Sequence, residues 1–205
     1  MKNKIKNLKK IKKQSFFREN YYESFNYINE SRKYIYFAIA VFFIFTLIGF
    51  LIPAPQEIAE QILKFIEELL KKTENMNQFE LIRFIFLNNL QSSFYGMIFG
   101  VFLGIFPMIT IIANGYLLGF VAAMSVRYEG ISVLWRLFPH GIFELPAVFI
   151  SLGLGLKLGM FIFQKNKSED FKKYSWNSVK VFVFIIIPLL IVAAIIEGSL
   201  IFLFG

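Results

Sequence analysis

The chain contains no cysteine and only one histidine among its 205 residues. Without cysteine it has no disulfide bond, thiolate metal site or cysteine nucleophile. One histidine supplies no HExxH motif, and catalytic zinc usually takes three protein ligands with more nitrogen among them. The sequence also lacks a Ser/His/Asp arrangement, a phosphate-binding glycine loop and a nucleic-acid-binding module. We therefore expect a protein that is not an enzyme, holds no metal or other cofactor, and does not bind nucleic acid.

Charged residues make up only 18% of the chain, whereas hydrophobic residues make up 57% and include 27 Phe. The surface of a soluble domain needs more charge than this, so the excess apolar side chains must face lipid. The net charge of +8 comes from basic residues beside hydrophobic blocks. Anionic lipid is the natural counter-charge for that arrangement. The composition predicts an all-α, polytopic transmembrane helical bundle in the cell membrane.

Five charge-poor stretches have the length of a membrane-spanning helix, about 20 residues for a hydrocarbon core of about 30 Å. They cover residues 34–52, 84–105, 107–126, 139–163 and 179–204. Together they define a transmembrane domain over residues 34–205. Pro107 is the predicted turn between the second and third spans, and Pro139 opens the fourth. A polar loop is expected at 164–177, and the short apolar piece 131–138 is expected to be re-entrant or interfacial.

Two segments outside the spans have amphipathic character. Residues 1–33 begin with a lysine-rich stretch in which Ile5, Leu8 and Ile11 recur every three residues, so this segment is either a basic interfacial helix or a disordered basic tail. Residues 56–72 carry an apolar helical row on one side and acidic residues on the other. This second segment predicts a surface helix that lies against the membrane or the bundle.

The distribution of cations predicts the orientation in the membrane. Residues 1–33 hold ten Lys and Arg against three acids, and residues 164–178 hold four against two. Residues 53–83 hold four against six, and residues 127–138 hold two Arg. With five spans, the two basic segments fall on one side. We therefore expect the N-terminus in the cytoplasm and the C-terminus outside.

Small residues recur at four-residue spacing in the second, third and fourth spans. The predicted packing positions are Gly96, Gly100, Gly104, Gly115, Gly119, Gly155 and Gly159. Such rows let two helix backbones approach closely in a membrane. Two interpretations stand: packing within one chain, and a contact between two copies in a homo-oligomer.

A few polar residues fall inside the predicted spans, where ionisable groups are costly and usually have a partner. They are Asn88, Asn89, Asn114, His140, Glu144 and Glu197. His140 and Glu144 are four residues apart, so their Cβ atoms lie about 6 Å from each other on one helix face. In the predicted topology all six can meet in the outer half of the bundle. This polar cluster is a hydrogen-bonded clasp or a proton or ion relay. A metal site, and with it an intramembrane metalloenzyme, is a third interpretation that needs ligands the sequence does not show.

Several motifs resemble those of the stage II sporulation protein M family. The resemblance is carried by Pro139–Ala147 with the glycines that follow, by Phe86–Leu90, by Asn114–Gly119 and by Glu197. It covers most of residues 32–204 and implies about five spans. It also implies that the namesake is a scaffold that recruits peptidoglycan-degrading enzymes during engulfment and does no chemistry itself.

We expect a non-enzymatic membrane scaffold that self-associates and whose surface helices engage membrane lipids or other membrane proteins. A small transporter or channel is the alternative, with the polar cluster handling a proton, a cation or a lipid headgroup.

Overall fold

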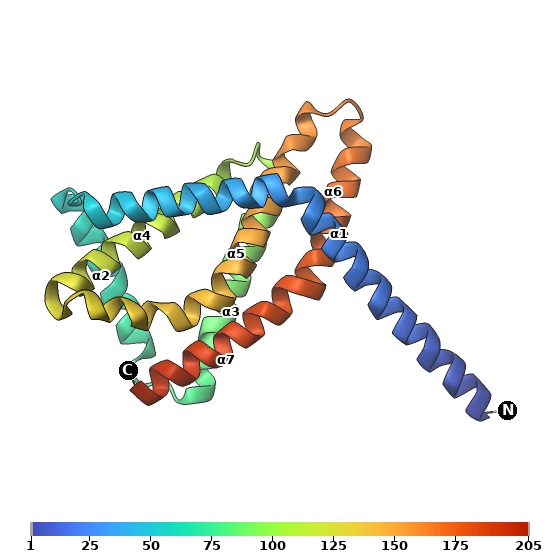
Figure 1. The fold of residues 1–205 in the computed structure, drawn as a ribbon, viewed down its shortest axis with the longest axis horizontal. Helices are drawn as coiled ribbons and strands as arrows, with labels where there is room; N and C mark the ends of the chain where they lie inside the picture. The colour runs from blue at the N-terminus through green and yellow to red at the C-terminus, as the bar shows by residue number, and fades with distance from the viewer. Residues whose placement is uncertain (1, 205) are drawn as a thin grey trace.

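The computed structural model describes the backbone of residues 2–204, and the side chains of residues 15–134, 141 and 144–203. Every regular element in this part of the chain is a helix, so the predicted all-α class is confirmed (Figure 1). The elements are α1 (Lys2–Leu51), α2 (Gln56–Thr73), α3 (Gln78–Ile98), η1 (Phe99–Val101), α4 (Ile105–Glu129), η2 (Ile131–Leu137), α5 (Phe138–Gly159), η3 (Met160–Phe163), α6 (Lys167–Val181), η4 (Phe182–Ile186) and α7 (Ile187–Phe204).

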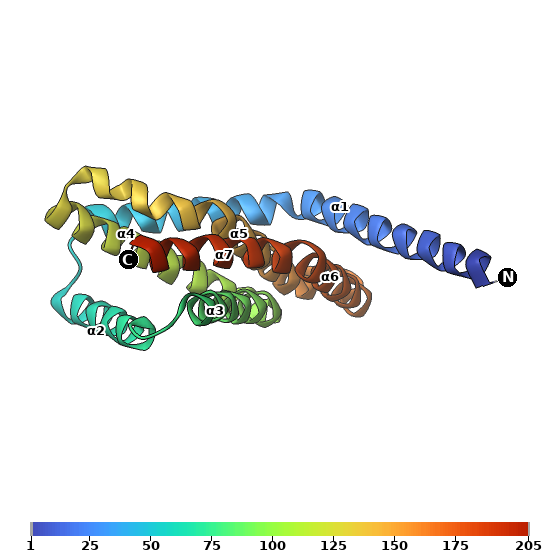
Figure 2. The ribbon, with the colours of Figure 1, turned by 90° about the horizontal axis from the view of Figure 1, so that it is seen from below.

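α1 is one continuous helix of 50 residues, where the sequence predicted a separate N-terminal segment followed by a span. No glycine or proline interrupts the chain before Gly49, so nothing ends the helix earlier. It stops at Leu51, shortly before Pro53, because proline removes a helical donor and restricts the residue before it. At about 1.5 Å per residue, α1 is about 75 Å long and extends beyond the other helices (Figures 1 and 2).

α2 is the amphipathic helix that the sequence predicted over residues 56–72. Glu57 lies in its first turn and Lys71 and Lys72 in its last, which complements the helix dipole. Lys71 Nζ donates a hydrogen bond of 2.6 Å to Glu67 Oε1, and this bond lowers the pKa of the Glu67 carboxyl. Figure 2 shows α2 beside the bundle rather than within it.

α3 and α4 form the predicted hairpin, but the chain turns before Pro107. α3 begins with a capping box, because the side chain of Asn77 accepts from the Glu80 amide and the side chain of Glu80 accepts from the Asn77 amide. The turn is made by η1 and by Leu103 and Gly104, whose φ angles are 57° and 73°. Pro107 is the third residue of α4, where a missing amide donor costs nothing.

The predicted loop 164–177 is mostly helical. α6 begins at Lys167, and Glu169 and Asp170 lie in its first turn, where acidic side chains stabilise the positive end of the helix dipole. α6 continues through the π-helical turn η4 into α7. Pro188 is the second residue after this turn. A π turn accommodates the ring and the missing donor better than a regular α-helical turn.

The long helices alternate in direction along the chain. α1, α4 and α7 run one way, and α3 and α5 run the other way. Four sets of contacts establish these directions. They are Phe42–Gly115 and Thr46–Gly119 between α1 and α4; Phe42–Phe149 and Ile35–Gly153 between α1 and α5; Ser93–Ser151 between α3 and α5, continued by Gly100–Gly155 at η1; and Ile82–Gly198 between α3 and α7, continued by Phe94–Phe182 at η4. The bundle therefore has an α2 end, where α3 and α5 begin and α1, α4 and α7 finish, and an α6 end opposite.

Four helical segments of the described chain are long and apolar enough to cross a membrane. They are Ser15–Leu51, Ile105–Glu129, Glu144–Phe163 and Lys167–Leu203. By length and composition, these four helices are those expected of a membrane protein. α3 is not among them, although it packs against two of them, α5 and α7. The predicted span 84–105 covers most of α3 together with the turn to α4.

Candidate functional site

The predicted polar cluster falls mainly on three helices that pack against one another, α3, α5 and α7. Asn89 on α3, Glu144 on α5 and Glu197 on α7 are half-buried. Asn88 on α3 and Asn114 on α4 are exposed. The side chain of His140 lies outside the described residues.

The contacts beside these residues place them toward the α2 end of the bundle. Gly198, next to Glu197, faces Ile82 in the first turns of α3, and a Cβ added at Gly198 would lie 2.5 Å from Ile82 Cγ1. Ala147, three residues after Glu144, is fully buried in a cluster with Leu190 of α7. The helices thus bring Glu144, Glu197 and Asn89 to similar heights along the length of the bundle. The meeting of all six side chains stays a prediction.

The glycines of α3 and α5 lie where these two helices approach most closely. Added Cβ atoms at Gly96 and Gly100 would meet Leu152 and the Gly155 backbone, and one at Gly155 would lie 2.6 Å from the Gly96 carbonyl oxygen. Gly159 faces the backbone of Gly100 and Gly104 in the same way. At Gly100, Gly155 and Gly159 the backbones are too close for any side chain larger than hydrogen, whereas Gly96 faces the Leu152 side chain. The row therefore packs one helix of the chain on another.

A second glycine row joins α4 to α1. A Cβ at Gly115 would lie 2.5 Å from the Phe42 carbonyl oxygen, and one at Gly119 would meet the Thr46 carbonyl oxygen. Gly49 of α1 faces the backbone of α4 in return. Because these surfaces are already covered inside the chain, they are not the faces that a second copy would contact.

The polar residue that the sequence analysis missed is Lys157. It lies in α5 near the α6 end and is only 7% exposed. Its Nζ donates a hydrogen bond of 2.9 Å to Ser31 Oγ, lies 3.8 Å from the centre of the Tyr27 ring and is 3.9 Å from Glu30 Oε2. A hydroxyl, an aromatic face and a carboxylate therefore surround the ammonium group, which a buried cation needs.

Ser31 connects this site to the backbone of α1. Its Oγ is fully buried, accepts from Lys157 and donates to the Tyr27 carbonyl oxygen at 2.6 Å. About two turns nearer the start of α1, Lys180 forms an ion pair with Glu23 between α6 and α1. The arrangement locks α1 against α5 and α6. Its signal in the sequence is a single lysine inside an otherwise uncharged run of about 20 residues.

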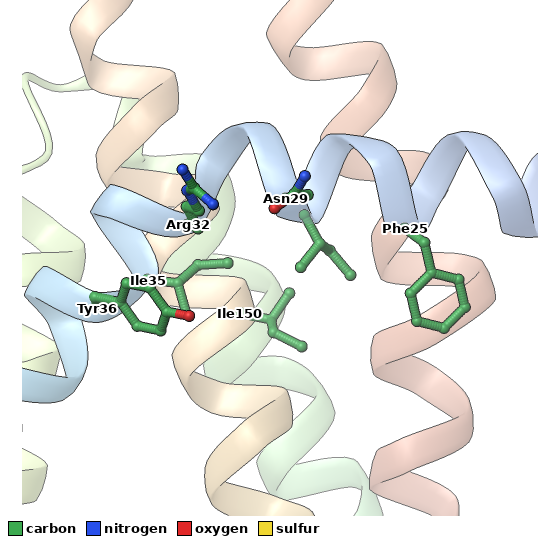
Figure 3. A pocket seen from close by; sticks show the side chains of 7 residues that line it. Phe25, Asn29, Arg32, Ile35, Tyr36 and Ile150 are labelled. Carbon is green, nitrogen blue, oxygen red and sulfur yellow. The ribbon is translucent and has the colours of Figure 1, made fainter.

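A shallow groove of 310 Å³ follows α1 where α5 passes beneath it (Figure 3). It is lined by Phe25, Ile28, Asn29, Arg32, Ile35, Tyr36 and Ile150. Arg32 and Asn29 are exposed, and the charge-free stretch of α1 begins directly after Lys33. The groove therefore combines apolar walls with a guanidinium and an amide at the level where α1 becomes fully apolar.

Comparisons with known proteins agree with this architecture. The family model described as stage II sporulation protein M matches residues 38–200. An uncharacterized protein of Methanocaldococcus jannaschii is 33% identical over 141 residues, which cover 66% of this chain and 62% of the relative. The chain thus spans less than two thirds of the length of that relative. No solved structure matches the chain. Since the matched region runs from the C-terminal part of α1 into α7 and includes both glycine rows and the predicted polar residues, the chain belongs to the stage II sporulation protein M family.

Proposed function

We propose that the protein is a non-enzymatic membrane scaffold that self-associates and organises partner proteins or lipids. In this proposal the α6 end is cytoplasmic and the α2 end lies outside. The alternating helix directions support the orientation, because they bring the cation-rich segments 1–33 and 164–178 to the same end.

The exposure of α2 is the observation that carries the proposal. None of its 18 residues is buried, and its apolar row, which includes Ile58 and Phe65 at 43% and 48% exposure, is left open. A short helix of this kind is marginal in water and becomes stable when its apolar row lies on a membrane surface. We therefore place the apolar row of α2 on the outer leaflet.

With its apolar row on lipid, α2 presents acidic residues to water. These are Glu57, Glu60, Glu67 and Glu68, all of them exposed. A surface of this charge attracts a partner with a basic surface, and the attraction weakens as salt rises. α2 thus serves as the part of the scaffold that recruits a protein outside the membrane.

At the cytoplasmic end, the groove beside Arg32 supports a lipid partner. A guanidinium binds a phosphate with two hydrogen bonds, and the apolar walls formed by Ile35, Tyr36 and Ile150 suit an acyl chain. The exposed aromatic side chains of Phe16, Tyr22 and Phe25 lie on the same helix and suit the membrane interface.

The experiment attaches an environment-sensitive fluorophore to single cysteines on the two sides of α2, in the full chain reconstituted in vesicles. Because the chain has no cysteine of its own, each label reports one position. We expect a blue-shifted emission at Ile62→Cys and an emission typical of a water-exposed fluorophore at Glu60→Cys.

A second experiment places a photo-crosslinking residue at position 60, which should capture a partner protein in cells. Glu57→Gln together with Glu68→Gln should reduce the capture, whereas Lys64→Gln should not. Equal emission from both sides of α2 would contradict the membrane placement, and equal capture by all variants would contradict recruitment through charge.

A further inference from the structure

α3 carries a polar stripe on the side that faces away from the bundle. The stripe is formed by Asn88, Gln91, Ser92 and Tyr95, all of which are exposed. The opposite side of α3 is covered, since Leu81, Ile85, Ser93, Gly96 and Met97 are its buried residues. Figure 2 shows α3 at the margin of the bundle, with α5 and α7 on one side of it.

This stripe, together with Arg83 and Asn89, makes α3 less apolar than the four candidate spans, although α3 runs through the bundle from the α2 end to the α6 end. Amide and hydroxyl groups that face hydrocarbon lose their hydrogen bonds with water and gain none in return. Nor can the stripe turn inward, because the glycine row holds the other side of α3 against α5. Another protein surface must therefore cover it.

We propose that the stripe is the self-association surface of the scaffold and that its partner is a second copy of α3. This inference rests on the proposed scaffold function and identifies the surface through which the copies meet. Positions 88, 91 and 95 are spaced by three and four residues, the a, d, a spacing of a two-stranded helical seam. Two copies related by a two-fold axis along the membrane normal run parallel and place each of these residues opposite its own counterpart.

The side chains of the stripe are able to pair with the same side chains of a second copy. An asparagine or glutamine amide both donates and accepts, so Asn88 and Gln91 pair with the same residue of the second chain without any charge to neutralise. A stripe of lysine or glutamate would repel its own copy and would require a different partner. An asparagine at an a position also fixes the register of a helix pair and limits the number of strands.

The surface beside the stripe provides a recess for packing. A groove of 280 Å³ is lined by Leu90, Gln91, Phe94, Tyr95, Phe182 and Ile187. It adjoins the stripe through Gln91 and Tyr95, and its other lining residues are apolar. Apolar side chains that flank the stripe on the second copy, such as Leu87 at 39% exposure, can pack here while the amides pair.

Cysteine crosslinking of the full chain in native membranes tests the proposal, because the natural chain contributes no thiol. Single substitutions Asn88→Cys, Gln91→Cys and Tyr95→Cys are compared with Leu47→Cys, an α1 position that is 58% exposed. In a specific dimer the effective concentration of the two thiols is high, so mild oxidation should give at least about tenfold more disulfide-linked dimer at the stripe than at position 47. A second variant, Asn88→Leu with Gln91→Leu, should convert the dimer to monomer in mild detergent without loss of folded protein.

Three outcomes overturn the proposal. Equal crosslinking at position 47 indicates random collision. Efficient modification of the stripe cysteines by a water-soluble thiol reagent, without crosslinking, indicates that the stripe lines an aqueous surface. An absence of both crosslinking and modification, with an unchanged mass for the double leucine variant, indicates that lipid or a different protein covers α3. Because α2 takes no part in this experiment, dimers can persist when partner capture fails, and the two proposals fail separately.

Discussion

Lys157 Nζ lies 2.9 Å from Ser31 Oγ and joins α5 to α1 through a buried hydrogen bond. The bond ties the apolar interior to the charge-rich half of α1, because Ser31 directly precedes Arg32 and Lys33. An ammonium group on a long side chain at this level keeps its charge at the edge of the apolar region while its methylene groups stay within it.

Removal of the Ser31 hydroxyl should destabilise the protein more than removal of a neighbouring buried hydroxyl. Ser31→Ala leaves the buried ammonium group with one hydrogen bond fewer, and we expect a loss of about 1–3 kcal/mol. Ser24 is the matched control: it is also buried on α1, and its Oγ has no hydrogen-bond partner among the described residues. Ser24→Ala should change stability by less than about 0.5 kcal/mol. Unfolding in detergent measures both, and equal losses would contradict the role assigned to Lys157.

The close approach of α3 and α5 predicts a low tolerance for any side chain at Gly155. A methyl group there would lie 2.6 Å from the Gly96 carbonyl oxygen, and backbone atoms cannot move aside as a side chain can. We expect Gly155→Ala to cost about 1–3 kcal/mol through overpacking. Ala40→Val, which adds apolar atoms at an exposed position of α1, is the control and should be close to neutral. Thermal unfolding that shows Gly155→Ala to be as stable as the natural chain would contradict the observed helix separation.

The structural features behind these two predictions differ in how well they could be predicted from the sequence. The glycine spacing was visible as a pattern, and the amphipathic period gave α2 to within one residue of its observed end. Lys157 was missed because one lysine in an apolar run gives no sign of its partner. That partner, Ser31, is 126 residues away and lies in a segment that was assigned outside the membrane. The continuity of α1 was missed because its change from lysine-rich to apolar resembles a boundary, although no residue there breaks a helix.

The position of the turn between α3 and α4 also could not be predicted from the sequence alone. The sequence favours Pro107 as the residue that breaks the helix, but the chain turns at Leu103 and Gly104. Pro107 then occupies the first turn of α4, where proline is well tolerated. Sequence alone does not separate these two uses of proline, because both place it close to the end of a helix.

The groove at the cytoplasmic end predicts a preference for anionic lipid. Arg32→Gln removes the guanidinium and its hydrogen bonds to a phosphate; a hydrogen bond to a charged group contributes about 1.5–3 kcal/mol, so the affinity for phosphatidylglycerol should fall at least about tenfold. Arg18→Gln is the control, since Arg18 is exposed on the same helix but does not line the groove. The rise in melting temperature on addition of phosphatidylglycerol, compared with phosphatidylcholine, measures the effect. An equal loss in both variants would indicate general attraction to charge and no lipid site.

A substitution at Glu144 distinguishes the proposed scaffold function from the transporter alternative. If its half-buried carboxyl helps to hold α5 in place, Glu144→Gln should lower the melting temperature in detergent by a few degrees, because the amide is uncharged and has one acceptor oxygen where the carboxylate has two. In liposomes with an imposed pH gradient, neither the natural chain nor the variant should carry more protons than protein-free vesicles do. A proton flux that disappears in a folded Glu144→Gln variant would favour the transporter.

The orientation of the bundle decides whether α2 can recruit a partner outside the membrane. Two single-cysteine variants test it: Glu67→Cys on α2 and Lys172→Cys on α6, both at exposed positions on opposite ends of the bundle. Since basic segments stay on the cytoplasmic side, a membrane-impermeant maleimide should label position 67 in intact cells and position 172 only after permeabilisation. The reverse pattern would place α2 in the cytoplasm, where the anionic inner leaflet repels its acidic face, and the proposed recruitment would then need a partner on the other side of the membrane. The helix packing would be unchanged by that result, because the contacts among α1, α3, α4, α5 and α7 do not depend on which side the cell places them.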